Sequence, residues 1–199
     1  MNTISTTLST TAVFSDDGSK RYLLTKTWDS SKTNLVIIML APSEASGVAL
    51  DNTTMLVLNN ASRLGYGSVT ILNLFATLND FGLKHAELDD EENLKIIVSA
   101  AKTADVVVYA PGVGKAKNKL FMERQRQVLD ALRPEEHKLF CLCNESGGAR
   151  LQHPLSPSVR VWELSPLKIE ELVKPEPATE PAPTQKKMGK KVPSKETVA

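Results

Sequence analysis

The residues best suited to chemistry follow a short apolar run at residues 35–40. Ser43 and Glu44 open a small, polar loop after this run, at the end of a strand where open α/β sheets bind ligands. Asp51 then precedes a helical pattern and can cap that helix. The amino end of such a helix carries unpaired backbone N–H groups and a positive dipole, which suit an anion. These residues indicate an anion-binding loop or, alternatively, an ordinary capped connection between a strand and a helix.

A second group of polar side chains lies close to residue 150. Arg150, Gln152 and His153 offer a cation, an amide and an imidazole within four positions. Their loop is expected at the same sheet edge as Pro42 and Asn73, because the ends of parallel strands meet there. This convergence favours a common site, whereas a lone loop histidine would simply be exposed.

Two other motifs do not support a cofactor or a metal. Residues 112–115 read GVGK between a strand and a helix, but a Walker loop needs four residues between its glycines and a Ser or Thr after the lysine. The dinucleotide-binding pattern also fails, because Lys117 stands where its third glycine belongs. Cys141 and Cys143 have no histidines at zinc-ligand spacing. We therefore expect no cofactor and no bound metal.

The elements that must position these residues alternate between strands and helices. Apolar, β-branched runs predict strands at residues 35–40, 68–73, 105–110, 138–142 and 159–164. Apolar residues at helical spacing predict helices at residues 53–64, 91–103 and 120–132. A turn at residues 16–18 indicates a hairpin or an edge strand before them. This order predicts an α/β fold, a three-layer α/β/α sandwich with a mostly parallel central sheet.

Composition limits the classes of partner and the number of domains. The 199 residues carry a formal charge of +1, so any nucleic-acid contact must depend on a local basic patch. The amino-terminal segment lacks the features of a signal peptide, and the apolar run is too short to span a membrane. We therefore expect a cytoplasmic protein with no membrane partner, folded as one domain over residues 1–165. Proline and lysine are frequent in residues 166–199, which predicts a flexible tail, with a short helix at residues 167–173 that can cap the domain.

Several short motifs occur in a set order along the chain. They are Arg21-Tyr22 with Trp28, Leu40-Ala41-Pro42-Ser43 followed by Asp51 and Thr53, Gly65-Tyr66-Gly67, Asn73-Leu74-Phe75-Ala76 and His153-Pro154-Leu155. In this order they resemble a bacterial and phage family catalogued as domain of unknown function 1643, over roughly residues 12–164. The chain departs from the L-N-P-S-T-A-D pattern of that family where Ala41 replaces Asn and Ser46 replaces Asp.

The same layout is similar to the uracil-DNA glycosylase superfamily. That resemblance implies a uracil-DNA-glycosylase-like fold in which Pro42 and Ser43 belong to the water-activating loop. It also implies that Asn73 hydrogen-bonds a base edge, and that His153 stabilises a leaving base or contacts a phosphate.

Ala41 stands where such a loop places its water-activating residue, which argues against full activity. The nearest carboxylates that can take this role are Glu44 and Asp51. The resemblance therefore implies a glycosylase-like domain that recognises a base or nucleotide, in DNA or free, and cleaves an N-glycosidic bond without a metal. One alternative is a non-catalytic module of phage or mobile-element origin that binds nucleic acid or a protein partner. Another is an enzyme acting on free nucleotides.

The candidate catalytic residues are Glu44, Asp51 and His153, and the candidate substrate-binding residues are Pro42, Ser43, Asn73, Phe75 and Arg150.

Overall fold

The computed structural model describes residues 1–44, 47–88, 90–143 and 151–173. Arg150, one of the candidate site residues, lies outside these ranges, as does most of the expected tail. Among the described residues, no helix combines the length and the apolar character needed to cross a membrane.

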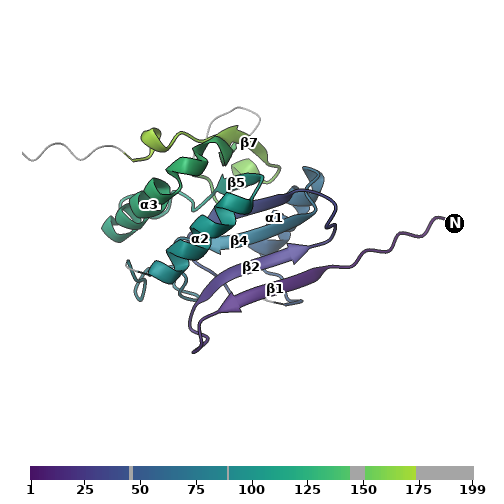
Figure 1. The fold of residues 1–199 in the computed structure, drawn as a ribbon, viewed down its shortest axis with the longest axis horizontal. Coiled ribbons are helices and arrows are strands. Elements are labelled where there is room, and N and C mark those ends of the chain that lie inside the picture. The colour runs from purple at the N-terminus through teal and green to yellow at the C-terminus, as the bar shows by residue number, and fades with distance from the viewer. Residues whose placement is uncertain (45–46, 89, 144–150, 174–199) are drawn as a thin grey trace, which may run out of the picture.

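Seven strands of the described chain form one sheet in the order β1-β2-β4-β3-β5-β6-β7 (Figure 1). Their bounds are β1 Ser9–Phe14, β2 Arg21–Thr27, β3 Asn34–Met39, β4 Ser68–Asn73, β5 Val106–Tyr109, β6 Leu139–Cys143 and β7 Glu163–Pro166. The strands expected near residues 35–40, 68–73, 105–110 and 138–142 are β3 to β6. These four lie side by side in the middle of the sheet.

The sheet is mixed, which corrects the expectation of a mostly parallel one. Neighbours among β4, β3, β5 and β6 are parallel, whereas β1 with β2, β2 with β4, and β6 with β7 are antiparallel. Parallel neighbours need a long crossover, and helices supply one after β3, β4 and β5. A tight turn with Gly18 at a φ of 71° joins β1 to β2, so these strands form a hairpin instead.

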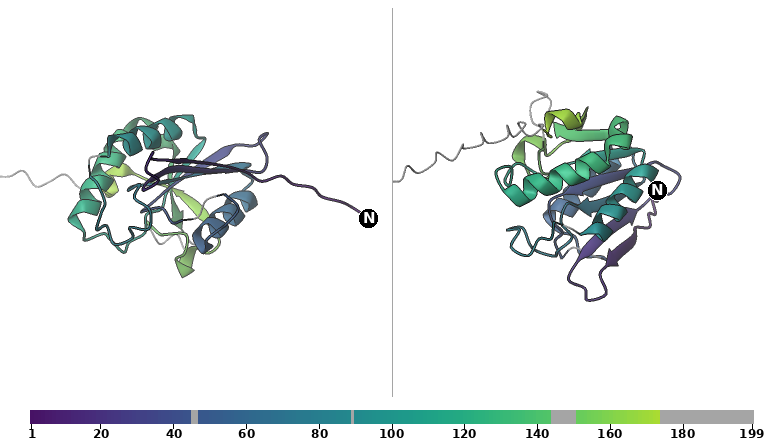
Figure 2. Two further views of the ribbon diagram at one scale, coloured as in Figure 1. Left: turned by 90° about the horizontal axis from the view of Figure 1, so that it is seen from below. Right: turned by 60° about the vertical axis from the view of Figure 1, so that its left-hand side comes forward.

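Helices cover both faces of the sheet. They are α1 Asn52–Arg63, α2 Glu91–Thr103 and α3 Lys119–Ala131, with short 3-10 helices η1 Arg133–Lys138, η2 Pro157–Val159 and η3 Ile169–Glu171. α1 packs on one face, and α2 and α3 pack on the other (Figure 2). Asp51, Asp90 and Asn118 start the three α-helices, each accepting a hydrogen bond from a backbone N–H in the first turn.

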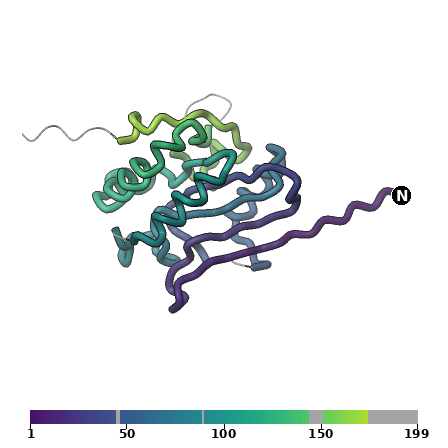
Figure 3. The backbone as a smooth tube through the Cα atoms, viewed as in Figure 1, coloured from purple at the N-terminus to yellow at the C-terminus, as the bar shows by residue number. Residues whose placement is uncertain are grey.

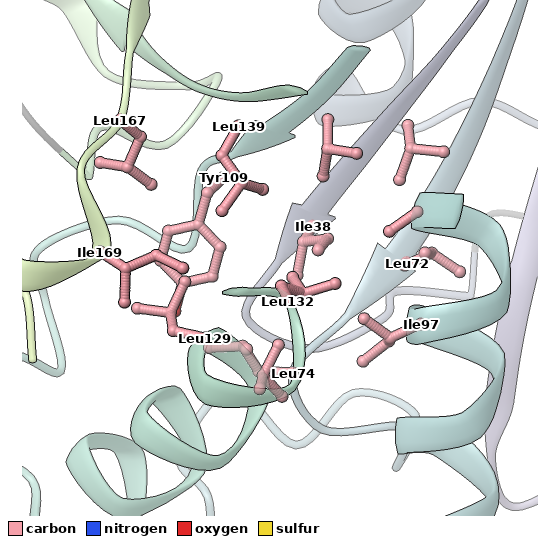
Figure 4. Packing of buried hydrophobic residues seen from close by; sticks show 14 of the residues in the cluster. Ile38, Leu72, Leu74, Ile97, Tyr109, Leu129, Leu132, Leu139, Leu167 and Ile169 are labelled. Atoms are coloured by element: carbon pink, nitrogen blue, oxygen red, sulfur yellow. The ribbon is translucent and has the colours of Figure 1, made fainter. Parts of the chain in front are cut away.

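Alternate residues of β3 enter two separate hydrophobic clusters. Leu35 and Ile37 pack toward α1, while Val36 and Ile38 pack toward α2 and α3. Figure 4 shows the second cluster, in which Ile38 lies near side chains of β4, β5 and α3. Full burial of each such side chain stabilises the fold by about 1.5–3 kcal/mol. The central strand therefore fixes the position of the loop that follows it.

The packed chain extends beyond residue 165, where the sequence analysis placed the end of the domain. The fifth predicted strand, at residues 159–164, forms later as β7, because η2 occupies Pro157–Val159. Leu167 and Ile169 follow β7 and are buried in the cluster beneath α3. This segment covers the end of the core.

Candidate functional site

A pocket of about 200 Å³ lies at the carboxyl end of β3, beside the amino end of α1. Its volume corresponds to about seven water molecules, so it suits a small ring or a single functional group. Six of its lining residues are polar, namely Arg21, Ser43, Asp51, Thr53, Thr54 and His153. The other four are Met39, Ala41, Phe81 and Leu155. Segments far apart in the sequence therefore meet here.

A larger hollow, of about 420 Å³, lies beside α3 and the end of the described chain. Its lining residues are Lys119, Met122, Glu123, Gln125, Arg126, Leu172 and Val173. Glu123 and Arg126 form a surface ion pair at 2.6 Å, which is an ordinary feature of an exposed helix. The smaller pocket gathers half-buried titratable groups from several elements and is the better candidate site.

Asp51 is a half-buried carboxylate at the amino end of α1. Its Oδ1 accepts a hydrogen bond from the Thr54 N–H at 2.6 Å, and its side chain also hydrogen-bonds that of Ser43. Burial alone would raise the pKa of Asp51, but these hydrogen bonds and the charge of Arg21 outweigh it. The pKa therefore lies below its ordinary value, and the carboxylate is ionised at neutral pH.

The carboxylate of Asp51 changes what the amino end of α1 can bind. The sequence predicts an anion site at this helix end, but Asp51 already accepts a hydrogen bond from one of its backbone N–H groups. A fixed negative charge at that point disfavours a second anion. The pocket is therefore better suited to a neutral group that donates a hydrogen bond to Asp51.

Arg21 connects three strands at the back of the pocket. It begins β2, is only 3% exposed, and donates from Nη1 to the Ser43 carbonyl at 3.1 Å. Its Nη2 donates to Asn73 Oδ1 at 3.5 Å. Burial lowers the pKa of Arg21 to about 10, although Asp51 opposes this shift, so the guanidinium remains charged at neutral pH. It balances the charge of Asp51.

A second buried cation of β2 holds the same loop further along. Lys26 is fully buried, and its Nζ donates to the Gly47 carbonyl and, at 3.0 Å, to Thr10 Oγ1. Burial lowers its pKa. Arg21 and Lys26 therefore bind two backbone carbonyls of the segment between β3 and α1, and this positions Ser43 and Asp51.

His153 faces Asp51 from the last loop of the pocket. Its Nδ1 accepts a hydrogen bond from the Leu155 N–H at 3.2 Å, so a neutral imidazole carries its proton on Nε2. Burial lowers the pKa of His153, and the charge of Asp51 only partly offsets this. Gly112 lies behind the ring at a φ of +85°, where an added Cβ would be 3.1 Å from His153 Cβ. The side chain is therefore a neutral N–H donor held in place by its neighbours.

Four candidate residues from the sequence analysis lie near the pocket without lining it. Glu44 is exposed and accepts a hydrogen bond from Asn79 Nδ2 at 2.8 Å. Pro42 is buried, and its carbonyl accepts from the Asn79 N–H. Asn73 is buried behind Arg21, and its Nδ2 has no hydrogen-bond partner in the described part of the chain. Phe75 belongs to the hydrophobic core.

Three of the candidate residues, Ser43, Asp51 and His153, do line the pocket. Arg21, Phe81 and Leu155 line the pocket but were not predicted as site residues, although Arg21 and Leu155 belong to the motifs that carry the family resemblance. Phe81 is half exposed in an irregular loop, and no local pattern marks it.

Comparison with known proteins places the whole pocket within one family. The model of a family described as protein of unknown function, DUF1643, matches residues 21–155. The chain belongs to this family. The matched region begins at Arg21 and ends at Leu155, both of which line the pocket. No match was found to a curated protein or to a solved structure.

Proposed function

We propose that the pocket recognises a nucleobase, in DNA or in a free nucleotide, and that Asp51 and His153 promote hydrolysis of the N-glycosidic bond without a metal. The observation that carries this proposal is the pairing of an ionised carboxylate with a neutral imidazole in one small pocket. Perturbed groups of this kind on separate elements are typical of sites of acid–base chemistry.

The hydrogen-bonding groups of the pocket match a base edge. Asp51 accepts, His153 Nε2 donates, and the hydroxyls of Thr53 and Thr54 can do either. A nucleobase edge carries the complementary mixture of donors and acceptors. Phe81 supplies an aromatic face for the ring, since base stacking on such side chains contributes about 1–3 kcal/mol.

The proposed reaction uses Asp51 as the general base. Asp51 takes a proton from water, whose oxygen attacks the anomeric carbon of the sugar. The C–N bond breaks, and its electron pair leaves with the base. The Nε2–H of His153 hydrogen-bonds the negative charge that develops on the departing base. Ser43 orients the carboxylate through its side-chain hydrogen bond.

The proposal extends to the architecture of a uracil-DNA glycosylase, with three layers and the site at one sheet edge. Helices on both faces and a pocket at the carboxyl end of a central parallel strand support it. An experimental structure with a bound nucleobase would test the likeness directly.

A non-catalytic binding module is the second candidate, and Ala41 favours it. Its methyl group lines the pocket at the position where the resemblance places a water-activating residue. Glu44 is exposed and bonded to Asn79, so Asp51 is the only carboxylate lining the described pocket. In this alternative, the same groups bind a base without cleaving a bond.

Binding and base release can be measured separately on the full chain. The ligands are the free nucleobases, their nucleosides and nucleoside monophosphates, and single-stranded DNA containing the four normal bases and uracil. We expect binding by the wild-type protein, a much larger loss of base release than of binding in Asp51→Asn, whose amide oxygen still accepts a hydrogen bond, and weakening of both in His153→Ala. Asp90→Asn removes the same charge at the cap of α2, and His137→Ala removes an exposed imidazole, so both serve as controls. Binding of a ligand without release of a base would support the non-catalytic binding module. No binding of any ligand would overturn both proposed functions.

A further inference from the structure

The strand β1 forms one edge of the sheet in the described part of the chain. It pairs with β2 and is the terminal strand in the sheet order of the described residues. Figures 1 and 3 show residues 1–8 running on from this strand, away from the body of the molecule. An edge strand presents unpaired N–H and C=O groups at every second residue, which is a template for another strand.

Charged residues and prolines, which commonly protect an exposed edge, are missing from β1, and its only irregularity is a shift of register between Val13 and Phe14 at the end of the strand. Residues 1–14 contain no Asp, Glu, Lys, Arg or Pro, although the 24% charged residues of the whole chain predict about three in such a length. The opposite edge strand, β7, has only four residues and contains both Glu163 and Pro166. Charges, prolines and a short length are among the means by which proteins block edge pairing. The two edges of the sheet therefore differ in their capacity to pair.

We propose that β1 pairs with β1 of a second copy of this chain, so that two sheets join across a twofold axis. Antiparallel pairing of identical strands is self-complementary. It would place like charges near one another if β1 carried any, and the absence of charge from residues 1–14 removes that repulsion. Because β7 is blocked, the contact closes as a dimer and does not propagate into a filament.

The length of the free segment determines the strength of this contact. The six residues of β1 span about 20 Å, which alone gives a small interface. Pairing that continues through residues 1–8 would extend it to about 48 Å. Leu8 and Val13 are both more than 40% exposed and would contact the partner. We therefore expect a dimer that dissociates on dilution.

Sedimentation equilibrium of the full chain over a range of concentrations tests the proposal. The expected result for the wild-type protein is a mass that rises from 21.7 kDa toward twice that value. Val13→Lys should shift dissociation to at least tenfold higher concentration, because a lysine on an edge strand repels its copy in the partner. Val161→Lys makes the same change at an exposed position before β7 and should leave the mass unchanged.

Leu8→Lys separates a lost interface from a lost fold. Leu8 precedes β1 and pairs with no strand among the described residues, so its replacement removes no ladder hydrogen bond of the hairpin. It should weaken the dimer with an unchanged far-ultraviolet spectrum. A wild-type mass of 21.7 kDa at every concentration would overturn the proposal, as would a dimer that both Val13→Lys and Leu8→Lys leave intact.

Discussion

At the scale of single residues, the pocket depends on three side chains that set one another's charge. Arg21 and Asp51 carry opposite charges that favour each other's ionised form, and burial keeps His153 neutral. The charge of Asp51 acts on the pKa of both Arg21 and His153, and the charge of Arg21 acts on that of Asp51. A change in Asp51 or Arg21 should therefore alter the pKa of its partners. This arrangement gives two predictions.

The first prediction concerns stability on acidification. Burial places the pKa of His153 in the folded protein below the ordinary 6.5, so the unfolded chain takes up the proton first. Stability should therefore be complete above about pH 7.5 and fall as the pH drops through 6.5 toward the folded pKa. Asp51 stays ionised in this window, because its pKa is below 3.8. Urea unfolding at several pH values should show a smaller decline for His153→Gln than for the wild type. The same decline for both proteins would show that another group titrates.

The second prediction concerns Arg21. Replacing it with Met leaves the Ser43 carbonyl and Asn73 Oδ1 without this buried donor and removes the positive charge near Asp51. We expect a loss of about 1–3 kcal/mol in the free energy of unfolding, and a higher pKa for Asp51. Denaturant unfolding and a carbon NMR titration of the Asp51 carboxyl group measure these two effects.

Arg126→Met is the matched control for Arg21→Met. Arg126 lies on the exposed side of α3 and pairs with Glu123 at 2.6 Å, so its loss should change stability by no more than about 0.5 kcal/mol. If Arg21→Met changed neither the free energy of unfolding nor the pKa of Asp51, the positioning role of Arg21 would be contradicted.

At the scale of elements, sequence patterns predicted the central strands well and their partners poorly. The strands β3 to β6 are apolar runs buried on both sides, and such a continuous apolar run can be recognised in the sequence without knowledge of its neighbours. The turn at residues 16–18 predicted the hairpin of β1 and β2, but no local pattern specifies that β2 pairs with β4 and β7 with β6. Arg21 illustrates the same limit, because an arginine that begins a strand normally points to solvent. Its burial depends on Ser43 and Asn73, which are distant in the sequence.

The third prediction concerns the loop after β5, which positions His153. Gly112→Ala adds a Cβ 3.1 Å from His153 Cβ at a φ of +85°. We expect a loss of about 1–2 kcal/mol from backbone strain, together with displacement of the imidazole. Gly65→Ala has the same kind of strain at a φ of +91° but no neighbour within 4 Å.

Both glycine variants should therefore lower the melting temperature, but only Gly112→Ala should shift the imidazole NMR resonances of His153. It should also weaken binding of whichever nucleobase or nucleoside the wild-type protein retains. Equal imidazole resonances in Gly112→Ala and the wild type would show that the loop after β5 does not position His153.

At the scale of the whole molecule, the end of the folded unit was hard to predict from composition. Proline and charge become frequent after residue 165, which is why the sequence analysis ended the domain there. The short helix predicted at residues 167–173 forms in part as η3, but two apolar residues carry no periodic pattern that would mark them as core. Leu167 and Ile169 are nevertheless buried against the cluster that includes Tyr109 and Leu139 (Figure 4). The end of the folded unit therefore depends on contacts with residues that are distant in the sequence.

The fourth prediction tests this boundary through Ile169, which is fully buried. Ile169→Ala removes apolar contacts from the core and should cost about 2–5 kcal/mol of unfolding free energy. For a chain of this length each kcal/mol lowers the melting temperature by about 2–4 °C, so calorimetry can measure the loss. Val161→Ala at an exposed position should change stability by less than about 0.5 kcal/mol.

A chain ending at Val173 retains all described core residues and should melt close to the full chain, whereas one ending at Ser165 should melt well below it. Equal melting of the two truncated chains would place the end of the folded unit at residue 165 after all.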